Sequence, residues 1–355
     1  MNDTKIKDIL ISVIIPAYNS ENTIKPCLMS VINQKRYDVE IIVIDDGSID
    51  DTKKIVEKIC YKYDFVKYFY QSNGGVSSAR NNGIKKSQGN IILFLDSDDE
   101  LSKDSLNEMM NFYEKYNSDC VAAEVVDNNG TSKVKDVFKK EGTFKANTIE
   151  EIGNKMFYTR MGSAVGKIFK KEIIEKYKIY FDEKIGLAED FIFVHEYFTK
   201  CKSISKNGKA HYIVHNRPIS LSKSFSSNID DVVYIQRKVL NETFKVYPNY
   251  KQVFYQYEMN IVVSGMVNTI KNMYLYSSTY NHVDRRKKIK EILDSEDIKT
   301  ISKLSDFDGP KCKTDKIYLF ILKTESVFII DYFFLLRENV RKLKTRINNM
   351  RKKNE

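Results

Sequence analysis

Apolar runs and helical patterns alternate along the first hundred residues of the chain. Three short runs rich in Val and Ile, at residues 11–16, 40–46 and 90–96, end in polar residues. Such runs are typical of strands buried on both faces of a parallel sheet. Between them, apolar residues recur at helical spacing, at residues 20–34, 51–63 and 76–86. The alternation predicts an α/β fold with a mostly parallel sheet, whose functional residues gather at the carboxyl ends of the strands.

The pattern changes twice further along the chain. A helical segment at residues 102–116 and an apolar strand at residues 119–126 extend the predicted sheet, and residues 127–225 are less regular. Beyond residue 225 glycine becomes rare and long helical patterns dominate. We therefore expect an α/β domain over residues 1–225 and a helical region over residues 226–355.

Composition narrows the class of protein. The 355 residues are 42% hydrophobic and 30% charged, as expected of a folded globular protein. The five cysteines form no CxxC pair, which argues against a disulfide scaffold or a structural zinc site. The first apolar run, residues 9–17, lacks the cleavage site of a secretory signal. These observations favour a cytoplasmic protein with reduced thiols.

Most of the positive charge lies at the end of the chain. The net charge is +10, and residues 337–353 carry eight Lys and Arg against one Glu. A nucleic-acid-binding protein would carry its positive charge over the folded face that contacts the polymer. We therefore expect no nucleic-acid partner, and the basic tail points to a membrane surface.

Acidic residues follow two of the predicted strands. Asp96 and Asp98 come directly after the apolar run at residues 91–95, and hard cations such as Mg²⁺ or Mn²⁺ prefer such oxygen ligands. The DxD triplet alone is a weak signal, because a solvated acidic turn has the same form. Asp46 follows the second strand and is a candidate for binding a nucleotide base or ribose, although a turn followed by a helix cap is the simpler explanation.

A glycine pair precedes the predicted helix at residues 76–86. Helix N-termini attract phosphate, and this helix carries two serines and Arg80 in its first turns. The segment matches neither GxGxxG nor a P-loop, which argues against dinucleotide and ATP motifs. Arg80 is equally suited to pairing with one of the strand-end aspartates.

Four segments, taken together and in order, resemble the family 2 glycosyltransferases of GT-A fold, of the type that makes bacterial surface polysaccharides. The segments are residues 12–19, 44–48, 75–83 and 94–99. The resemblance is strong over residues 10–100 and looser to about residue 225. It implies a Rossmann-like fold with a C-terminal helical extension and a UDP-sugar donor. The donor-binding residues that it implies are Pro16, Ala17, Tyr18, Asn19, Asp46, Asn73, Gly75, Arg80, Asp96 and Ser97.

The resemblance also implies roles in catalysis and metal binding. Asp98 corresponds to the family's ligand for Mn²⁺ or Mg²⁺, and the Glu189-Asp190 pair stands where the family places its catalytic acids. Asp190 is the expected base, which takes the proton of the acceptor hydroxyl in an inverting transfer. The alternative is that both acids only complement the dipole of a helix. Some relatives add a histidine ligand, for which His215 is favoured over His211, although either could be a plain strand histidine.

A segment ahead of this pair, residues 162–170, also resembles one that the family places beside the acceptor. Lys167 in that segment has two candidate roles. It either contacts a phosphate or the acceptor, or it is an ordinary surface lysine.

The C-terminal region combines apolar and basic residues. Residues 317–336 are apolar, but charges at Lys323, Glu325 and Asp331 argue against a membrane-spanning helix. Leu336, Val340, Leu343 and Ile347 then form a stripe at helical spacing beside basic residues, typical of an interfacial anchor for anionic lipid. Packing on the catalytic domain and pairing in a homodimer are the competing interpretations.

The sequence thus predicts an inverting, metal-dependent glycosyltransferase, peripheral on the inner face of the cell membrane. It would move a sugar from a UDP-sugar to a hydroxyl of a glycan or lipid-linked acceptor. Two alternatives are a non-catalytic nucleotide-sugar-binding scaffold of a membrane assembly and a sugar nucleotidyltransferase. The residues do not select the donor sugar, the acceptor, the linkage or the processivity.

Overall fold

The computed structural model describes two compact units of the chain. The described residues are 11–36, 38–131, 144–146, 163–184, 189–215, 241–243, 245–246, 263, 266–267, 269–275, 280–294 and 313–351. The N-terminal unit comprises Met1–Pro218 and Asn241–Asn249, and the C-terminal unit comprises Ile219–Leu240 and Tyr250–Glu355. The boundary predicted at residue 225 lies outside the described residues.

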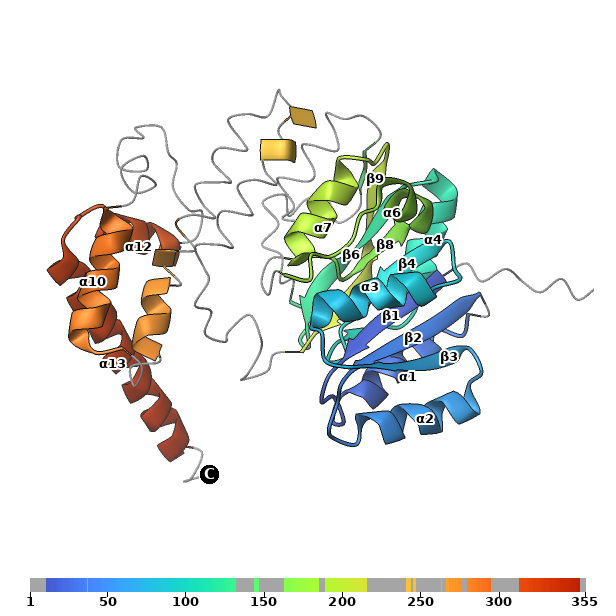
Figure 1. Ribbon diagram of the computed structural model, residues 1–355, viewed down its shortest axis with the longest axis horizontal. Coiled ribbons are helices and arrows are strands. Elements are labelled where there is room, and N and C mark those ends of the chain that lie inside the picture. Colours follow the sequence, from blue (N-terminus) through green and yellow to red (C-terminus); the bar gives the residue numbers. More distant parts are fainter. Residues whose placement is uncertain are drawn as a thin grey trace, which may run out of the picture. The chain divides into compact units, whose positions relative to one another are not determined.

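The N-terminal unit is built on a nine-stranded sheet (Figure 1). Strands β3, β2, β1 and β4 lie in this order and are all parallel, and β8 joins them to β6 by antiparallel pairing on both sides. The α/β fold predicted from the alternating pattern is therefore confirmed. The strands are β1 Ile11–Ala17, β2 Val39–Asp46, β3 Val66–Gln71, β4 Ile91–Phe94, β5 Glu100–Leu101, β6 Cys120–Asp127, β7 Phe144–Ala146, β8 Lys167–Lys170 and β9 Ile204–Val214.

Helices cover both faces of this sheet. Alternate residues of β1 and β2 pack in one apolar core with helices α1, α2 and α4, and the residues between them face α3. Both faces of these strands are therefore buried, which explains why their sequences are continuous apolar runs. The described helices of this unit include α1 Ile24–Ile32, α2 Thr52–Lys62, α3 Val76–Lys86, α4 Ser105–Tyr116, α6 Lys171–Tyr177 and α7 Glu189–Phe198.

Helix α3 lies unusually close to the sheet. A Cβ atom at Gly83 would lie 2.3 Å from Ile14 Cγ2, so a side chain at this position has no room. The contact fixes the depth of α3 against β1. Because α3 carries Arg80 one turn earlier, it also fixes the distance of that guanidinium from the strand ends.

An aromatic cluster anchors α7 on the same face of the sheet. The Phe193 ring stacks on Phe181 with centroids 4.2 Å apart and meets Phe94 edge-on at 5.6 Å. Phe169 of β8 completes the cluster, with its centroid 5.5 Å from that of Phe193. Such pairs add to the free energy gained by burying aromatic area. The cluster therefore holds the N-terminus of α7 near the end of β4.

The C-terminal unit is helical, as the sequence predicts. Its described helices include α10 His282–Leu293, α12 Lys313–Leu322 and α13 Val327–Arg351. Leu322, Ile330 and Phe334 belong to its apolar core. Asp331 is buried there, where it accepts hydrogen bonds from Tyr274 Oη and, at 2.7 Å, from Arg286 Nε. Among the described helices, none is both long and apolar enough to cross a membrane.

Candidate active site

Asp46, at the carboxyl end of β2, organises the loop that precedes α3. Its Oδ1 atom accepts hydrogen bonds from Gly74 N and Gln71 Nε2, each at 2.8 Å, and its Oδ2 atom accepts one from Gly75 N at 2.8 Å. Asp46 is 4% exposed. Asp46 thus holds the glycine pair at the edge of the sheet, and contact with the nucleotide base stays a prediction.

The loop after β1 is tied to the loop after β2. Asn19 N donates to Ser48 Oγ at 2.9 Å, and Ile49 N donates to Asn19 Oδ1 at 2.9 Å. Asn19 has a φ of +48°, a left-handed conformation that asparagine tolerates better than most residues. The neighbouring Tyr18 is 52% exposed. These bonds present Tyr18 at the edge where donor binding is predicted.

The remaining predicted donor-binding residues lie at the same edge of the sheet. Pro16 and Ala17 are buried at the end of β1, and Asn73 is exposed. Ser97 Oγ lies 2.8 Å from Ser20 Oγ, which joins the loop after β4 to the loop after β1. The structure therefore brings these residues together, and their contacts with a donor stay predictions.

Three acidic residues after β4 form a group that fits a cation. Asp96, Asp98 and Asp99 each offer a carboxylate oxygen, and these oxygens lie within 4.8 Å of one another. Burial, together with the charge of Asp96, raises the pKa of Asp99 to about 7. Burial also raises the pKa of Asp96. A divalent cation would relieve this crowding of negative charge, and oxygen ligands suit Mg²⁺ or Mn²⁺.

Asp99 also ties the end of β9 to this site. Its Oδ2 atom accepts a hydrogen bond from Tyr212 Oη at 2.8 Å, and its Oδ1 atom accepts one from His215 N at 3.0 Å. Tyr212 Oη in turn accepts a hydrogen bond from Asp96 N at 3.2 Å. Tyr212 is a site residue that the sequence analysis missed, because nothing in the motif indicates which distant strand packs against it.

The two candidate histidines take different positions on and after β9. His215 Nε2 lies 2.8 Å from Glu100 Oε1, next to the acidic group but not a member of it. The backbone of His211 pairs with the start of α4, where Ser105 Oγ donates to its carbonyl oxygen at 2.9 Å. Metal ligation by His215 stays a prediction.

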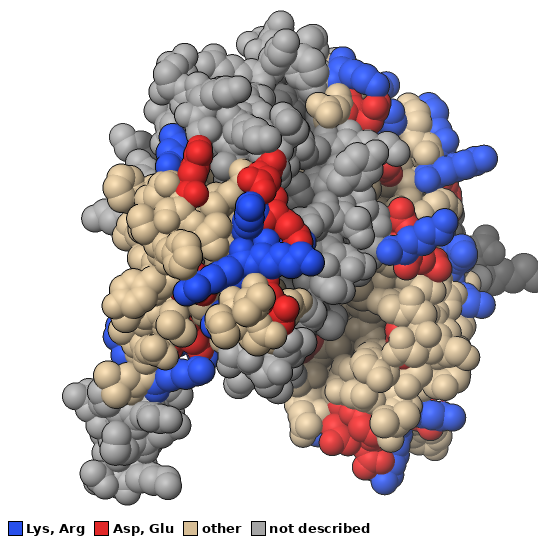
Figure 2. Space-filling model, turned by 60° about the vertical axis from the view of Figure 1, so that its left-hand side comes forward, with Lys and Arg blue, Asp and Glu red and all other residues tan. Residues whose placement is uncertain are grey.

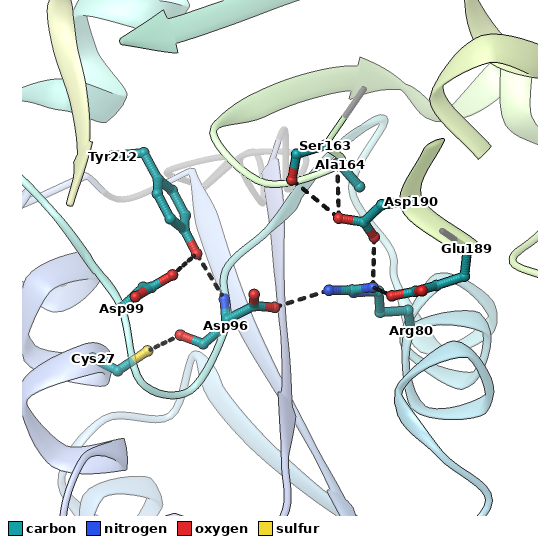
Figure 3. Close-up of polar contacts among 9 residues, drawn as sticks. All are labelled: Cys27, Arg80, Asp96, Asp99, Ser163, Ala164, Glu189, Asp190 and Tyr212. Atoms are coloured by element: carbon teal, nitrogen blue, oxygen red, sulfur yellow. Dashed lines mark hydrogen bonds and ion pairs between the residues drawn. The ribbon is translucent and has the colours of Figure 1, made fainter. Parts of the chain in front are cut away.

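Arg80 joins Asp96 of the acidic group to the predicted catalytic pair (Figure 3). Its Nη2 atom donates to Asp96 Oδ1 at 3.0 Å, and its Nη1 atom donates to Asp190 Oδ1 at 2.7 Å and Glu189 Oε1 at 3.2 Å. The Arg80 side chain is 4% exposed. Burial alone would lower the pKa of Arg80, but the charges of Asp190, Asp96 and Glu189 raise it. Arg80 is therefore a fixed cation among three acids.

Asp190 is held from its other side by a turn before β8. Its Oδ2 atom accepts hydrogen bonds from Ser163 Oγ at 3.0 Å and from Ala164 N at 3.1 Å (Figure 3). Burial, followed by the charge of Asp190, raises the pKa of the neighbouring Glu189. The sequence analysis assigned no role to Ser163 or Ala164, since their partner lies 26 or 27 residues later in the chain.

Lys167 is not a surface residue, contrary to one of its two predicted roles. It is 5% exposed, on β8 between β4 and β6, and its Nζ atom donates to the carbonyl oxygen of Ser163 at 2.6 Å. Burial lowers the pKa of Lys167 to about 8. The sequence did not predict that Lys167 is buried, because a lysine at the edge of an apolar run is normally exposed.

Residues 12–178 match the model of the family described as Glycosyl transferase family 2. This part of the chain is therefore similar to that family, as the four motifs predict. The match covers the strand ends, the Asp96 group, Arg80 and Lys167, and it ends before the Glu189-Asp190 pair.

Two curated relatives are named as glycosyltransferases of poly(ribitol-phosphate). The chain is 35% identical over 212 residues to poly(ribitol-phosphate) beta-N-acetylglucosaminyltransferase TarP of Staphylococcus aureus. This alignment covers 58% of this chain and 63% of TarP. The chain is also 34% identical over 206 residues to poly(ribitol-phosphate) beta-glucosyltransferase of Bacillus spizizenii. That alignment covers 57% of this chain and 31% of the relative. The match thus spans less than two thirds of each of these relatives.

A solved structure supports the fold. The crystal structure of residues 1–349 of S. aureus TarS in complex with UDP-GlcNAc matches with a TM-score of 0.60 and 22% sequence identity. The match covers 91% of this chain and 89% of that chain. This likeness confirms the GT-A fold expected from the sequence.

Proposed function

We propose that this protein transfers a sugar from a UDP-sugar to a hydroxyl group of a surface-polymer precursor, with inversion at the anomeric carbon. The similarity to family 2 supports the reaction class. The matching structure that contains UDP-GlcNAc supports the donor class. The names of the relatives, which act on poly(ribitol-phosphate), support a polymeric acceptor.

Asp190 is the proposed base. In the proposed step the acceptor oxygen forms a bond to the anomeric carbon while the bond from that carbon to the diphosphate oxygen breaks. The hydroxyl proton passes to Asp190, and the electron pair of the broken bond leaves with UDP. The observation that carries this assignment is the clamp on Asp190, whose two oxygens are bound from opposite sides by Arg80 and by the Ser163 turn.

Asp98, with Asp96 beside it, is the proposed holder of Mn²⁺ or Mg²⁺. When bound, the cation neutralises charge that develops on the departing diphosphate. The clustering of three carboxylate oxygens within 4.8 Å supports this role. Asp99 belongs to the same group, and its two oxygens also accept hydrogen bonds from Tyr212 on β9 and from the backbone of His215, so it ties β9 to the proposed cation site.

The reaction is tested by measuring release of UDP from UDP-GlcNAc, UDP-glucose and UDP-galactose with poly(ribitol-phosphate) as acceptor. Asp190→Asn should lower kcat by about 10²-fold or more while UDP still binds, because the amide cannot take the proton. Asp182→Asn, an exposed acid before α7, is the matched control and should keep wild-type activity. Wild-type turnover in Asp190→Asn would remove Asp190 from the role of base. UDP binding without transfer by the native chain would favour the scaffold alternative.

We also propose that helix α13 attaches the protein to the inner face of the cell membrane. The side of α13 that carries Ile330 and Phe334 is buried in the core of its own unit. The opposite side is apolar yet exposed, with Phe328 and Tyr332 67% and 63% exposed. The other exposed apolar residues of this side are Ile329, Leu335, Leu336, Val340 and Leu343.

Cations flank this exposed apolar side. At 100° per residue, Lys342 projects to one edge of the apolar stripe and Lys344 to the other, and both are exposed. On the face shown in Figure 2, Lys and Arg side chains lie among Asp and Glu side chains as well as beside uncharged surface. An apolar stripe with a lysine at each edge is complementary to a surface of anionic lipid, which supports a membrane rather than a second copy of the chain as the partner.

A further inference from the structure

Lys167 is a buried cation that the proposed reaction does not use. The Lys167 side chain extends back along its own chain, and its Nζ atom donates to the carbonyl oxygen of Ser163, four residues earlier. Among the described residues, this is the hydrogen bond that the structure gives to the Lys167 ammonium. A buried ammonium needs such an acceptor, because desolvation strongly disfavours an unpaired charge.

The bond closes the turn at residues 163–166 into a fixed shape. Gly166 has a φ of +67°, and a Cβ there would lie 3.1 Å from Tyr212 Cβ, so the turn is packed tightly against β9. Ala123 N of β6 donates to the Gly166 carbonyl oxygen at 2.8 Å. The end of the turn next to β8 is thus held by the sheet. The opposite end of the turn, at Ser163, is exposed, and its carbonyl oxygen is held by the Lys167 ammonium.

That exposed end of the turn binds the proposed base. Ser163 Oγ and Ala164 N both donate to Asp190 Oδ2, while Arg80 binds Oδ1. Ser163 therefore makes one hydrogen bond as an acceptor and one as a donor. Its carbonyl oxygen accepts from Lys167, and its hydroxyl donates to Asp190. Any shift of the Ser163 backbone moves the donor that orients the carboxylate.

We propose that Lys167 is a positioning residue for Asp190, which fixes the Ser163 turn so that the carboxylate keeps one orientation toward the acceptor hydroxyl. This inference rests on the proposed function. Lys167 acts through Ser163 and does not contact the reacting atoms.

The test compares two buried lysines of the same sheet. Lys167→Met should lower kcat by about 10²-fold, the size of effect known for small misplacements of a catalytic group, and leave the Kd for UDP within twofold of wild type. Lys206→Met is the matched control, since Lys206 is 4% exposed on β9 and pairs with Glu124 at 2.5 Å. The control should lose a similar amount of thermal stability but keep its kcat.

A double-mutant cycle separates positioning from general loss of structure. Ser163→Ala should lower kcat about tenfold in the wild-type background, because it removes one hydrogen bond to Asp190. In the Lys167→Met background the same change should lower kcat less than twofold, since the turn is already displaced. If Lys167→Met does not fold, Lys167→Gln, a neutral side chain one atom shorter, replaces it in the cycle.

The outcomes are distinct. Independent, multiplicative effects of the two substitutions, or equal kcat losses in the Lys167 and Lys206 variants, would overturn the positioning role. A wild-type protein that binds UDP but transfers no sugar contradicts the proposed function itself, before Lys167 is tested.

Discussion

Arg80 is the residue on which the charge balance of the site depends. It is the cation that the structure places among Asp96, Glu189 and Asp190, and its side chain is 4% exposed. Three acids around one buried cation leave a negative excess that suits the binding of a divalent metal ion. Arg80 thereby links Asp96 of the acidic group to Asp190, the proposed base.

Replacing Arg80 should reduce both activity and stability. Arg80→Met leaves three acids without their cation, so the free energy of unfolding should fall by about 3 kcal/mol, as for other broken buried ion pairs. Arg80→Lys keeps the charge but lacks the planar fork that reaches acids on both sides. We expect kcat to fall at least about 10²-fold in both variants. Urea unfolding and the UDP-release assay measure the two effects.

The two variants separate charge from geometry. Arg80→Lys should retain more stability than Arg80→Met while losing comparable activity. Full activity in Arg80→Lys would mean that only a positive charge is needed, and that the two-sided contact has no role in transfer.

The sequence alone predicted where a site residue lies when that residue stands at the end of a recognisable strand. Asp46, Asp96 and Asp98 each follow a strand that the pattern identifies, and parallel strands end at one edge of the sheet. The partners of Arg80 at Glu189 and Asp190 lie 109 and 110 residues away. No spacing rule connects residues so far apart, so the sequence left the role of Arg80 open.

At the scale of elements, the predicted strands and helices agree with the structure where periodicity is strong. Helix α3 spans the predicted residues, whereas α1 begins at Ile24, four residues later than predicted, because the backbone first forms a turn at Ser20. The antiparallel direction of β8 was not predictable, since its sequence, two apolar residues between two lysines, is too short a pattern to indicate a strand or its partner. That inserted strand is the element that brings Lys167 and the Ser163 turn to Asp190.

The contact between α3 and β1 gives a prediction at this scale. Gly83→Ala should lower the free energy of unfolding by about 1 to 3 kcal/mol, because the new methyl group would overlap Ile14. Helix propensity alone predicts the opposite sign, a gain of about 1 kcal/mol. Lys85→Ala in the same helix is exposed and should change stability by less than about 0.5 kcal/mol. A more stable Gly83→Ala protein, measured by urea unfolding, would show that α3 does not pack against β1 as described.

At the scale of the whole molecule, the proposed attachment to the membrane depends on helix α13. Its stripe was recognisable in the sequence at Leu336, Val340 and Leu343, and the structure adds that these side chains are exposed. Arg341 donates to Glu338 at 2.6 and 2.8 Å and so is engaged within its own helix. Lys342 and Lys344 are therefore the better probes of lipid contact.

Membrane association should depend on these two lysines. Lys342→Glu with Lys344→Glu should weaken binding to vesicles containing phosphatidylglycerol by at least about tenfold, since each lysine near an anionic surface contributes about 1 kcal/mol. Lys287→Glu with Lys290→Glu makes the same change of charge on exposed positions of α10 and should bind nearly as wild type. Cosedimentation at rising salt measures both. Equal binding by all three proteins, or a dimer in solution that the α13 changes dissociate, would contradict the lipid assignment.

The central claim is that the carboxyl edge of the sheet binds a UDP-sugar with a divalent cation. The most direct measurement is calorimetric titration of UDP into the native protein, with and without Mn²⁺, repeated with Asp98→Ala and with GDP in place of UDP. The account predicts UDP binding that is at least about tenfold tighter with Mn²⁺, that loses this dependence in Asp98→Ala, and that exceeds GDP binding. Absence of UDP binding under all conditions, or binding indifferent to both Mn²⁺ and Asp98, would contradict it.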